Sequence, residues 1–376
     1  MIQDMHKKLL ALLSAAVLFC SCSNKMSPDD PLPETFDPSV FIGSRNQLIY
    51  AFDPVNGNKH WEYALNANLK SSPLLYNGFL YLPAESGDIH KIDPKRGKLV
   101  SKITIGGTLS ATPVGDGNMV YMLGDNGILY AISTADDAIQ WQYNTNSPAA
   151  NSSSPAISGN NVVFGSSNGK VYAVDKASGA LAWTYDAGAG NIFSSSPAVS
   201  GNHIYIGNYD TYLYALNADG SLQWKYKTGD KIESSPISYA GNIIVGSDDF
   251  KLHCVDSITG QLRWTYTTKE RVISSPYAYA QVIYFGSYDD SLYAVRINDG
   301  SRKWAFPAGA TVRSSPLVYN GRIYFGSYDK NLYALDTANG YISWFRNING
   351  VIDCSPVIDD LSGQSYNSSI SGLSIH

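Results

Sequence analysis

The sequence predicts an all-β protein, an eight-bladed β-propeller of four-stranded antiparallel blades. Three markers recur in one register along the chain. A Ser-Pro or Thr-Pro step returns every 39 to 42 residues, at Pro73, Pro113, Pro155, Pro197, Pro236, Pro276, Pro316 and Pro356. Tryptophan follows the same period at Trp61, Trp141, Trp183, Trp224, Trp264, Trp304 and Trp344, and a Gly-Ser turn ends an apolar run in most copies. A repeat of about 40 residues with four short strands is typical of a propeller blade.

One complete copy shows the four strands in order. Pro316 begins the first strand, where a missing N–H costs least. Asn320-Gly321 makes a tight hairpin turn into a second strand at 322–326, which is rich in β-branched and aromatic residues. The third strand is expected at 332–336 and the fourth at 341–345. The strands are apolar on both faces, so each small sheet must be covered on both sides by its neighbours.

The two ends of the repeat region favour a closed ring. The chain enters in mid-repeat at Val40 and leaves in mid-repeat after Ile358, and the two fractions make one blade. We therefore expect the C-terminal strand that starts at Pro356 to join the N-terminal blade. Pro33 is an alternative start, because it stands ten residues before Gly43, but it lacks the preceding Ser pair and a following apolar run.

The chain begins with a segment typical of export. Residues 1–22 read as a lipoprotein signal peptide, with a basic start and an apolar core at 9–19 that is shorter than the roughly 20 residues of a membrane-spanning helix. Cys22 follows the small residue Ser21, so we expect lipidation at Cys22. A plain secretory signal would instead release a soluble exported protein.

Three further segments complete the expected organisation. Residues 23–39 are Ser, Asn, Lys, Pro and acidic residues with little to bury, and we expect a flexible tether. Residues 40–360 form the propeller, and residues 361–376 are expected to be a C-terminal tail. Asp29-Asp30 in the tether suits a solvated linker, although a signal for export to the cell surface is an alternative.

The repeat resembles a known family. Ala173, Asp175, Gly179 and Trp183 form a frame similar to the tryptophan-docking motif of PQQ-like propeller repeats, and the resemblance covers residues 40–358. It implies that each Trp stacks on the motif of the next blade, where small Ala and Gly side chains admit it. The second copy departs from the motif, with Ser101 for Trp and Lys91 for Ala, and the third has Asp137 for Gly. The docking contact is expected to be weakest around the second blade.

Within that family, the combination of a lipid anchor and a ring of eight blades is most similar to the BamB-like lipoproteins of outer-membrane assembly. This resemblance implies a non-catalytic scaffold without a cofactor, anchored to the outer membrane by lipid only and facing the periplasm. The implied partner is the barrel-forming subunit of the assembly machinery, whose periplasmic domains dock on loops of one rim.

No residue pattern in the chain indicates catalysis or a metal site. The six His are not at ligand spacing, and no nucleophile or phosphate-binding motif is present. Quinone-dependent enzymes of the wider family often carry adjacent cysteines, which this chain lacks. A net charge of −5 argues against nucleic acid. An exported quinone-binding enzyme or sensor, and a surface lipoprotein that binds a glycan or protein, remain alternatives.

Two connections are longer than the rest. The spacing from Trp to the next Pro is 12 residues in six copies but 14 after Trp141 and after Trp183. Both additions belong to the same kind of inter-blade connection, so they should lie on one rim, one blade apart. Function usually sits in loops on a rigid scaffold. The candidate partner-binding residues are Asn146, Ser147, Asn151, Asn191, Ile192 and Phe193, with Phe193 as an apolar anchor.

Overall fold

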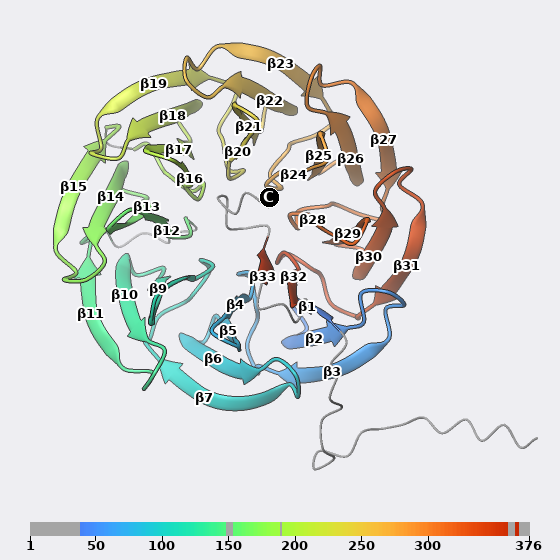
Figure 1. The fold of residues 1–376 in the computed structure, drawn as a ribbon, viewed down its shortest axis with the longest axis horizontal. Helices are drawn as coiled ribbons and strands as arrows, with labels where there is room; N and C mark the ends of the chain where they lie inside the picture. Colours follow the sequence, from blue (N-terminus) through green and yellow to red (C-terminus); the bar gives the residue numbers. More distant parts are fainter. Residues whose placement is uncertain (1–37, 148–152, 189, 360–364, 368–376) are drawn as a thin grey trace, which may run out of the picture. The chain divides into compact units, whose positions relative to one another are not determined.

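The fold is a ring of eight antiparallel sheets around a central channel (Figure 1). It is seen in a computed structural model that describes residues 38–147, 153–188, 190–359 and 365–367. The strands of each sheet run in order from the channel to the circumference. We number the blades along the chain, so that blade 1 contains β1, β2 and β3, and blades 2 to 8 each take the next four strands. The expected eight-bladed propeller is confirmed.

Each blade uses the same four strands. The innermost are β4 (Leu74–Tyr76), β8 (Val114–Asp116), β12 (Ala156–Ser158), β16 (Ala198–Ser200), β20 (Ile237–Tyr239), β24 (Tyr277–Tyr279), β28 (Leu317–Tyr319) and β32 (Val357–Asp359). The second are β5 (Phe79–Pro83), β9 (Met119–Leu123), β13 (Asn161–Gly165), β17 (His203–Gly207), β21 (Asn242–Gly246), β25 (Val282–Gly286), β29 (Arg322–Gly326) and β1 (Ser39–Gly43). These second strands are almost entirely buried, as strands covered on both faces must be.

The outer half of each blade is more exposed. The third strands are β6 (Asp88–Asp93), β10 (Ile128–Ser133), β14 (Lys170–Asp175), β18 (Tyr212–Asn217), β22 (Lys251–Asp256), β26 (Ser291–Arg296), β30 (Asn331–Asp336) and β2 (Leu48–Phe52). The outermost are β7 (Lys98–Thr104), β11 (Ile139–Asn144), β15 (Leu181–Asp186), β19 (Leu222–Lys227), β23 (Leu262–Thr267), β27 (Arg302–Pro307), β31 (Ile342–Asn347) and β3 (Lys59–Ala64). A register shift in the pairing of each third and fourth strand lies next to the Trp position.

The ring closes by joining the two ends of the repeat region. β32 pairs antiparallel with β1, with Val40 opposite Ile358, so Pro356 starts the closing strand. Cys354 adds a bond from its thiol to the carbonyl of Gly43 at 3.0 Å. On the outer side of the same joint, Arg346 of blade 8 donates to the carbonyl of Gly57 in blade 1 at 2.7 Å. The first and last repeat segments are thus joined by contacts in the inner strands and by contacts on the outer side of the ring.

One strand lies where a tail was expected. β33 (Ser365–Asn367) pairs antiparallel with β32 and makes blade 1 a five-stranded sheet. The C-terminal segment at 361–376 thus contains one short strand among its described residues. The physical reason is that the inner edge of β32 presents unpaired N–H and C=O groups, which a chain that turns back can hydrogen-bond.

A closed ring of hydrogen bonds links the blades near the channel. The residue before each strand-starting proline is Ser or Thr, and its backbone N–H donates to the hydroxyl of the equivalent residue in the next blade. The donors and acceptors run from Ser72 to Thr112, Ser154, Ser196, Ser235, Ser275, Ser315, Ser355 and back to Ser72, with all eight distances between 2.9 and 3.1 Å. The Ser-Pro step in the sequence therefore marks an inter-blade bond as well as the start of a strand.

Tryptophan links neighbouring blades at the outer radius. The indole of Trp264 lies against Gly300 of the next blade, and its Nε1 donates to the carbonyl of Ile297 at 2.7 Å. The same bond to the next blade is made by Trp61, Trp141, Trp183, Trp224, Trp304 and Trp344. A Cβ on Gly300 would lie 2.6 Å from the Trp264 ring, so the small residue is required.

The remaining seam, between blades 2 and 3, is built differently. Lys91 is 6% exposed at its side chain, and its Nζ lies 2.8 Å from Asp137 Oδ1. The same Nζ donates at 3.0 Å to the carbonyl of Thr134, which is the carbonyl that Trp would reach in this frame. Ser101 donates to the other oxygen of Asp137 at 2.6 Å, and Lys91 lies 4.6 Å from the ring of Phe79. The three departures from the motif therefore form one buried polar cluster in place of the indole.

The cluster predicts how single and combined substitutions will behave. Lys91→Met should lower the free energy of unfolding by about 3 kcal/mol, because Asp137 loses its counter-charge in a buried seam. The triple variant K91A/S101W/D137G, which restores the motif of the other seams, should be at least as stable as the wild type, since well-packed apolar groups often replace a buried ion pair without loss. Urea denaturation of the three proteins checks this, and a Lys91→Met protein as stable as the wild type would contradict it.

Candidate functional site: the loop-bearing rim and the channel mouth

The two long connections lie on the same rim of the ring. Each leaves an outermost strand and enters the innermost strand of the next blade. Thr145 donates its N–H to the carbonyl of Gly127 at 3.1 Å, and Ala187 donates to Gly169 at 2.9 Å. Both glycines are in the turn between the second and third strands of their blades, so these turns and the long connections share one side. We call this side the loop rim.

The structure corrects the role expected for Phe193. Its side chain is fully buried and packs on Tyr214 with a ring-centroid distance of 5.5 Å. It occupies the position four residues before the strand-starting proline, which is apolar and buried in other blades. The equivalent residues are Leu69, Leu109, Ile232, Val272, Val312 and Ile352. Phe193 is therefore part of the core and does not present its ring to a partner.

The other candidate loop residues differ in their exposure. Asn146 is exposed, with a left-handed φ of 55° that suits an Asn in a turn. Ser147 is buried, and its hydroxyl lies 3.1 Å from that of Ser167. Asn191 and Ile192 are half-buried. Asn151, like the expected lipidation site Cys22, lies outside the described residues.

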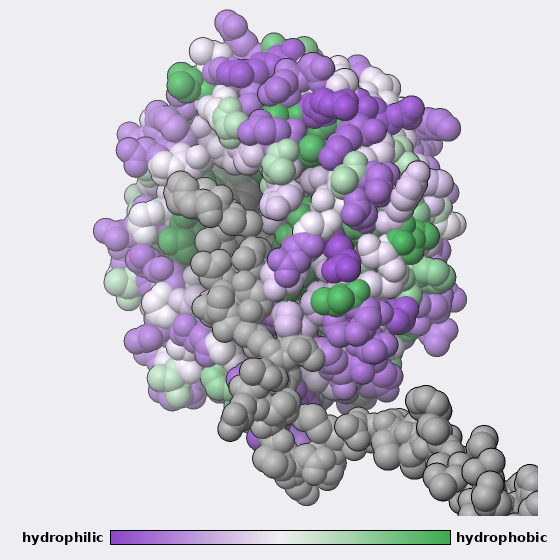
Figure 2. Space-filling view, turned by 45° about the vertical axis from the view of Figure 1, so that its right-hand side comes forward, coloured by the Kyte–Doolittle hydropathy of each residue, from purple (hydrophilic) through white to green (hydrophobic). Residues whose placement is uncertain are grey.

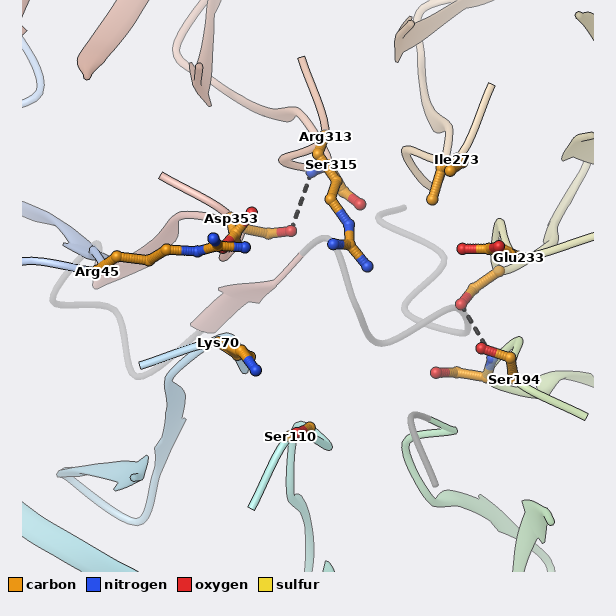
Figure 3. Close-up of a pocket in the computed structure, with 12 residues that line it drawn as sticks. Arg45, Lys70, Ser110, Ser194, Glu233, Ile273, Arg313, Ser315 and Asp353 are labelled. Atoms are coloured by element: carbon orange, nitrogen blue, oxygen red, sulfur yellow. Dashed lines mark hydrogen bonds and ion pairs between the residues drawn. The ribbon is translucent and has the colours of Figure 1, made fainter. Parts of the chain in front are cut away.

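A cavity of about 360 Å³ opens at the channel mouth on the loop rim (Figure 3). Part of its wall is the hydroxyl ring, through Ser196, Ser235, Ser315 and Ser355. The rest comes from Arg45 and from the third residue before seven of the strand-starting prolines, namely Lys70, Ser110, Ser194, Glu233, Ile273, Arg313 and Asp353. This third position varies from blade to blade inside a constant frame, and it gives the mouth its charge.

Most of the charged groups at the mouth are paired. Arg45 pairs with Asp353, and Lys70 pairs with Glu85. The hydrogen bond from Lys70 holds the pKa of the Glu85 carboxyl below its usual value. Glu233 pairs with Lys231 and raises the pKa of that amine.

The described residues show no metal-binding cluster, and both of their thiols are buried. Within them, no set of three or more His, Cys, Asp or Glu side chains is placed to hold a metal ion. Cys254 and Cys354 are both free and buried, and burial raises the pKa of each thiol to about 12. No helix in this part of the chain has the length and apolar character needed to cross a membrane.

The face of the molecule shown in Figure 2 has few large apolar areas. In the face shown in Figure 2, hydrophilic residues predominate and hydrophobic residues stand as separate spots. Several of the exposed apolar side chains, such as Leu181, Leu222 and Leu262, occupy one repeated position on the outermost strands. The loop rim and channel mouth are distinguished from this surface by residues that break the repeat.

Sequence reasoning found the long loops but missed the charged mouth. The missing signal is available in the repeat itself. When the copies are aligned on the strand-starting proline, the two preceding positions are nearly constant, while the third holds Lys70, Glu233, Arg313 or Asp353 in different blades. A variable charged position next to constant ones indicates a surface that the fold does not require.

The burial of Phe193 gives a direct test of its corrected role. Phe193→Ala should lower the free energy of unfolding by about 3–5 kcal/mol, as large-to-small core changes do. Phe345→Ala is the matched control, because Phe345 is 50% exposed on β31 and should change stability by only about 0.5 kcal/mol. Denaturant unfolding of both variants tests this prediction. If both substitutions change the free energy of unfolding equally little, the side chain of Phe193 is not part of the core.

Comparison with known proteins supports one family. The family model described as outer membrane protein assembly factor BamB matches residues 45–214, 167–249 and 210–353. BamB of Moranella endobia (strain PCIT) is 29% identical over 130 residues, which is 32% of this chain and 34% of that protein. BamB of Yersinia pestis is 25% identical over 122 residues, 30% of this chain and 31% of that protein. The matched part spans about a third of the length of these relatives.

Solved structures share the fold. BamB from Moraxella catarrhalis aligns with a TM-score of 0.67 at 17% identity, covering 76% of this chain and 90% of that one. A quinohemoprotein alcohol dehydrogenase from Comamonas testosteroni aligns with a TM-score of 0.64 at 13% identity, covering 78% and 70%. At these identities the likeness is one of fold. The family model spans most of the ring. The chain therefore belongs to the family of PQQ-like β-propellers whose model is described as outer membrane protein assembly factor BamB.

Proposed function

We propose that this protein is a non-catalytic, lipid-anchored scaffold in outer-membrane β-barrel protein assembly. The observation that carries the proposal is the match of the BamB family model across residues 45–353. The proposed location is the periplasmic face of the outer membrane, with Cys22 as the lipidated residue. The proposed partner is a protein, the barrel-forming subunit of the assembly machinery.

The loop rim is the proposed docking surface. Its two long connections expose Asn146, Gly188 and Gly190, and the two glycines have left-handed φ values of 98° and 87°. Next to the second connection, Tyr209 donates its N–H to the carbonyl of Ile192 at 3.0 Å and lies 4.6 Å below Lys231. Farther round the same rim, Tyr288 lies 4.5 Å below Arg271. Tyr and Arg are enriched where proteins contact one another. With Phe193 buried, the surface offered to a partner is polar and aromatic.

The proposed anchor predicts where variants will be found. Cys22→Ala should move the protein from the membrane pellet to the soluble envelope fraction, because the lipid is the proposed attachment to the bilayer. Cys20→Ala is the matched control and should stay in the pellet. Fractionation and immunoblotting read this out, and protease added to intact cells distinguishes the periplasmic face from the cell surface. Retention of the Cys22→Ala protein in the membrane would contradict the anchor.

The proposed docking surface is tested by affinity capture from native membranes. A variant that lacks 148–149 and 189–190 returns both connections to the common length, and it should recover much less of the barrel-forming subunit. Ile258→Ser is the control for surface change. Ile258 is 71% exposed in the turn before β23, and Ser257 in that turn bonds to Gly241 of the opposite rim.

The outcomes distinguish the proposed scaffold role from the proposed docking surface on the loop rim. Loss of the subunit with the shortened loops alone supports both the scaffold role and the loop rim. Equal recovery with all three proteins keeps the scaffold role and rejects the loop rim. Capture of no assembly subunit by the wild type rejects the scaffold role.

A further inference from the structure

Arg313 is the charged side chain of the channel mouth that the fold does not pair. Arg45, Lys70 and Glu233 each have an ion-pair partner. Within the described part of the chain, Arg313 forms no ion pair, and its guanidinium hydrogen-bonds to the hydroxyl of Tyr328. Figure 3 shows Arg313 and Lys70 extending into the cavity, with Asp353 on the wall between them. Among the described residues, Tyr328 is thus the hydrogen-bond partner of the Arg313 guanidinium, and the carboxylate of Asp353 lies near enough to act on its charge.

A guanidinium selects a particular kind of ligand. It has five N–H donors in a planar fork, and that fork matches the two oxygens of a carboxylate or phosphate. Charge-assisted bonds of this kind are about twice as strong as neutral ones. The first requirement on a ligand of this cavity is thus an anionic group beside Arg313.

The wall adds further donors around that group. The hydroxyls of Ser235, Ser315 and Ser355 each accept an N–H from the preceding blade in the hydroxyl ring. A hydroxyl that accepts still has its own O–H to donate. These serines line the cavity, so their O–H groups are available to ligand oxygens.

Asp353 adds an unmet acceptor. Its side chain is 5% exposed, and one carboxylate oxygen pairs with Arg45. The Tyr328 hydroxyl also hydrogen-bonds this carboxylate, while the buried Oδ1 has no close hydrogen-bond partner among the described residues. A buried acceptor without a donor is costly, and it is satisfied by a ligand that brings an O–H. The second requirement on a ligand is thus a hydroxyl group close to its anionic group.

We propose that the channel mouth binds a small hydroxylated carboxylate, such as an acidic sugar, with Arg313 on the carboxylate and Asp353 on a hydroxyl. The cavity of about 360 Å³ falls within the usual range of small-molecule sites. The cavity lies on the same rim as the proposed docking surface, but ligand binding needs only side chains of this chain and can be measured without a partner protein.

Titration calorimetry on the purified full chain at low salt tests the proposal with three probes. Sodium D-glucuronate should bind saturably at millimolar concentration or below. D-glucose lacks the carboxylate and acetate lacks the hydroxyls, so both should bind more weakly. Arg313→Gln should weaken glucuronate binding by about tenfold or more, as the loss of charged hydrogen bonds does. Arg263→Gln is the matched control, because Arg263 pairs with Asp256 on the outer side of blade 6.

Each other result overturns the proposal. No saturable binding of glucuronate means that the mouth holds only water and buffer ions. Equal binding by the Arg313→Gln protein, with an unchanged melting temperature, means that the ligand sits elsewhere. Glucose or acetate binding as tightly as glucuronate removes the need for the carboxylate or the hydroxyl. Inorganic phosphate binding more tightly than glucuronate means that the site takes a bare anion. None of these readings involves a partner protein, so the scaffold role is tested separately.

Discussion

The pairing of β32 with β1 is the constraint on which the rest of the ring depends. Each blade has two apolar faces and covers neither by itself, so every sheet needs a neighbour on both sides. Blades 2 to 8 are each built from four consecutive strands of the chain. Blade 1 forms only when a strand from the end of the repeat region joins three strands from its beginning. The hydroxyl ring, which passes from Ser315 through Ser355 to Ser72, is complete only in that arrangement.

Most of this architecture can be predicted from the sequence, because the same pattern of strands and turns recurs in eight copies. A single Ser-Pro step or Trp carries little information, but the same spacing in successive copies reports the sheet, its turns and its neighbours together. What repetition does not report is the conformation of an inserted segment. Two extra residues between Trp183 and Pro197 can bulge on either side of Phe193, and spacing alone does not decide whether the ring enters the core. The apolar residues at the same distance from other prolines hold the answer, because the core needs that position filled.

The seam between blades 2 and 3 was readable in part. Ser101, Lys91 and Asp137 each look like a loss when compared with the motif one residue at a time. Their meaning lies in a contact between two copies, where one amine neutralises one carboxylate and replaces the indole bond. β33 was missed for a related reason, since a three-residue strand has no periodicity of its own and forms only because an edge is available. The charged channel mouth likewise appears only when third positions from distant copies are brought together.

The Lys91–Asp137 cluster also makes one seam of the ring incompatible with the other seams. Eight blades of one design can in principle stack in a shifted order, or with a blade from a second molecule, because the indole of one seam fits the glycine of any other. Lys91 removes that freedom for blades 2 and 3. Opposite a glycine it would bury an unmatched ammonium, and Asp137 facing an indole would bury an unmatched carboxylate. The ionic joint therefore makes the seam between blades 2 and 3 chemically distinct from the seven seams that an indole closes.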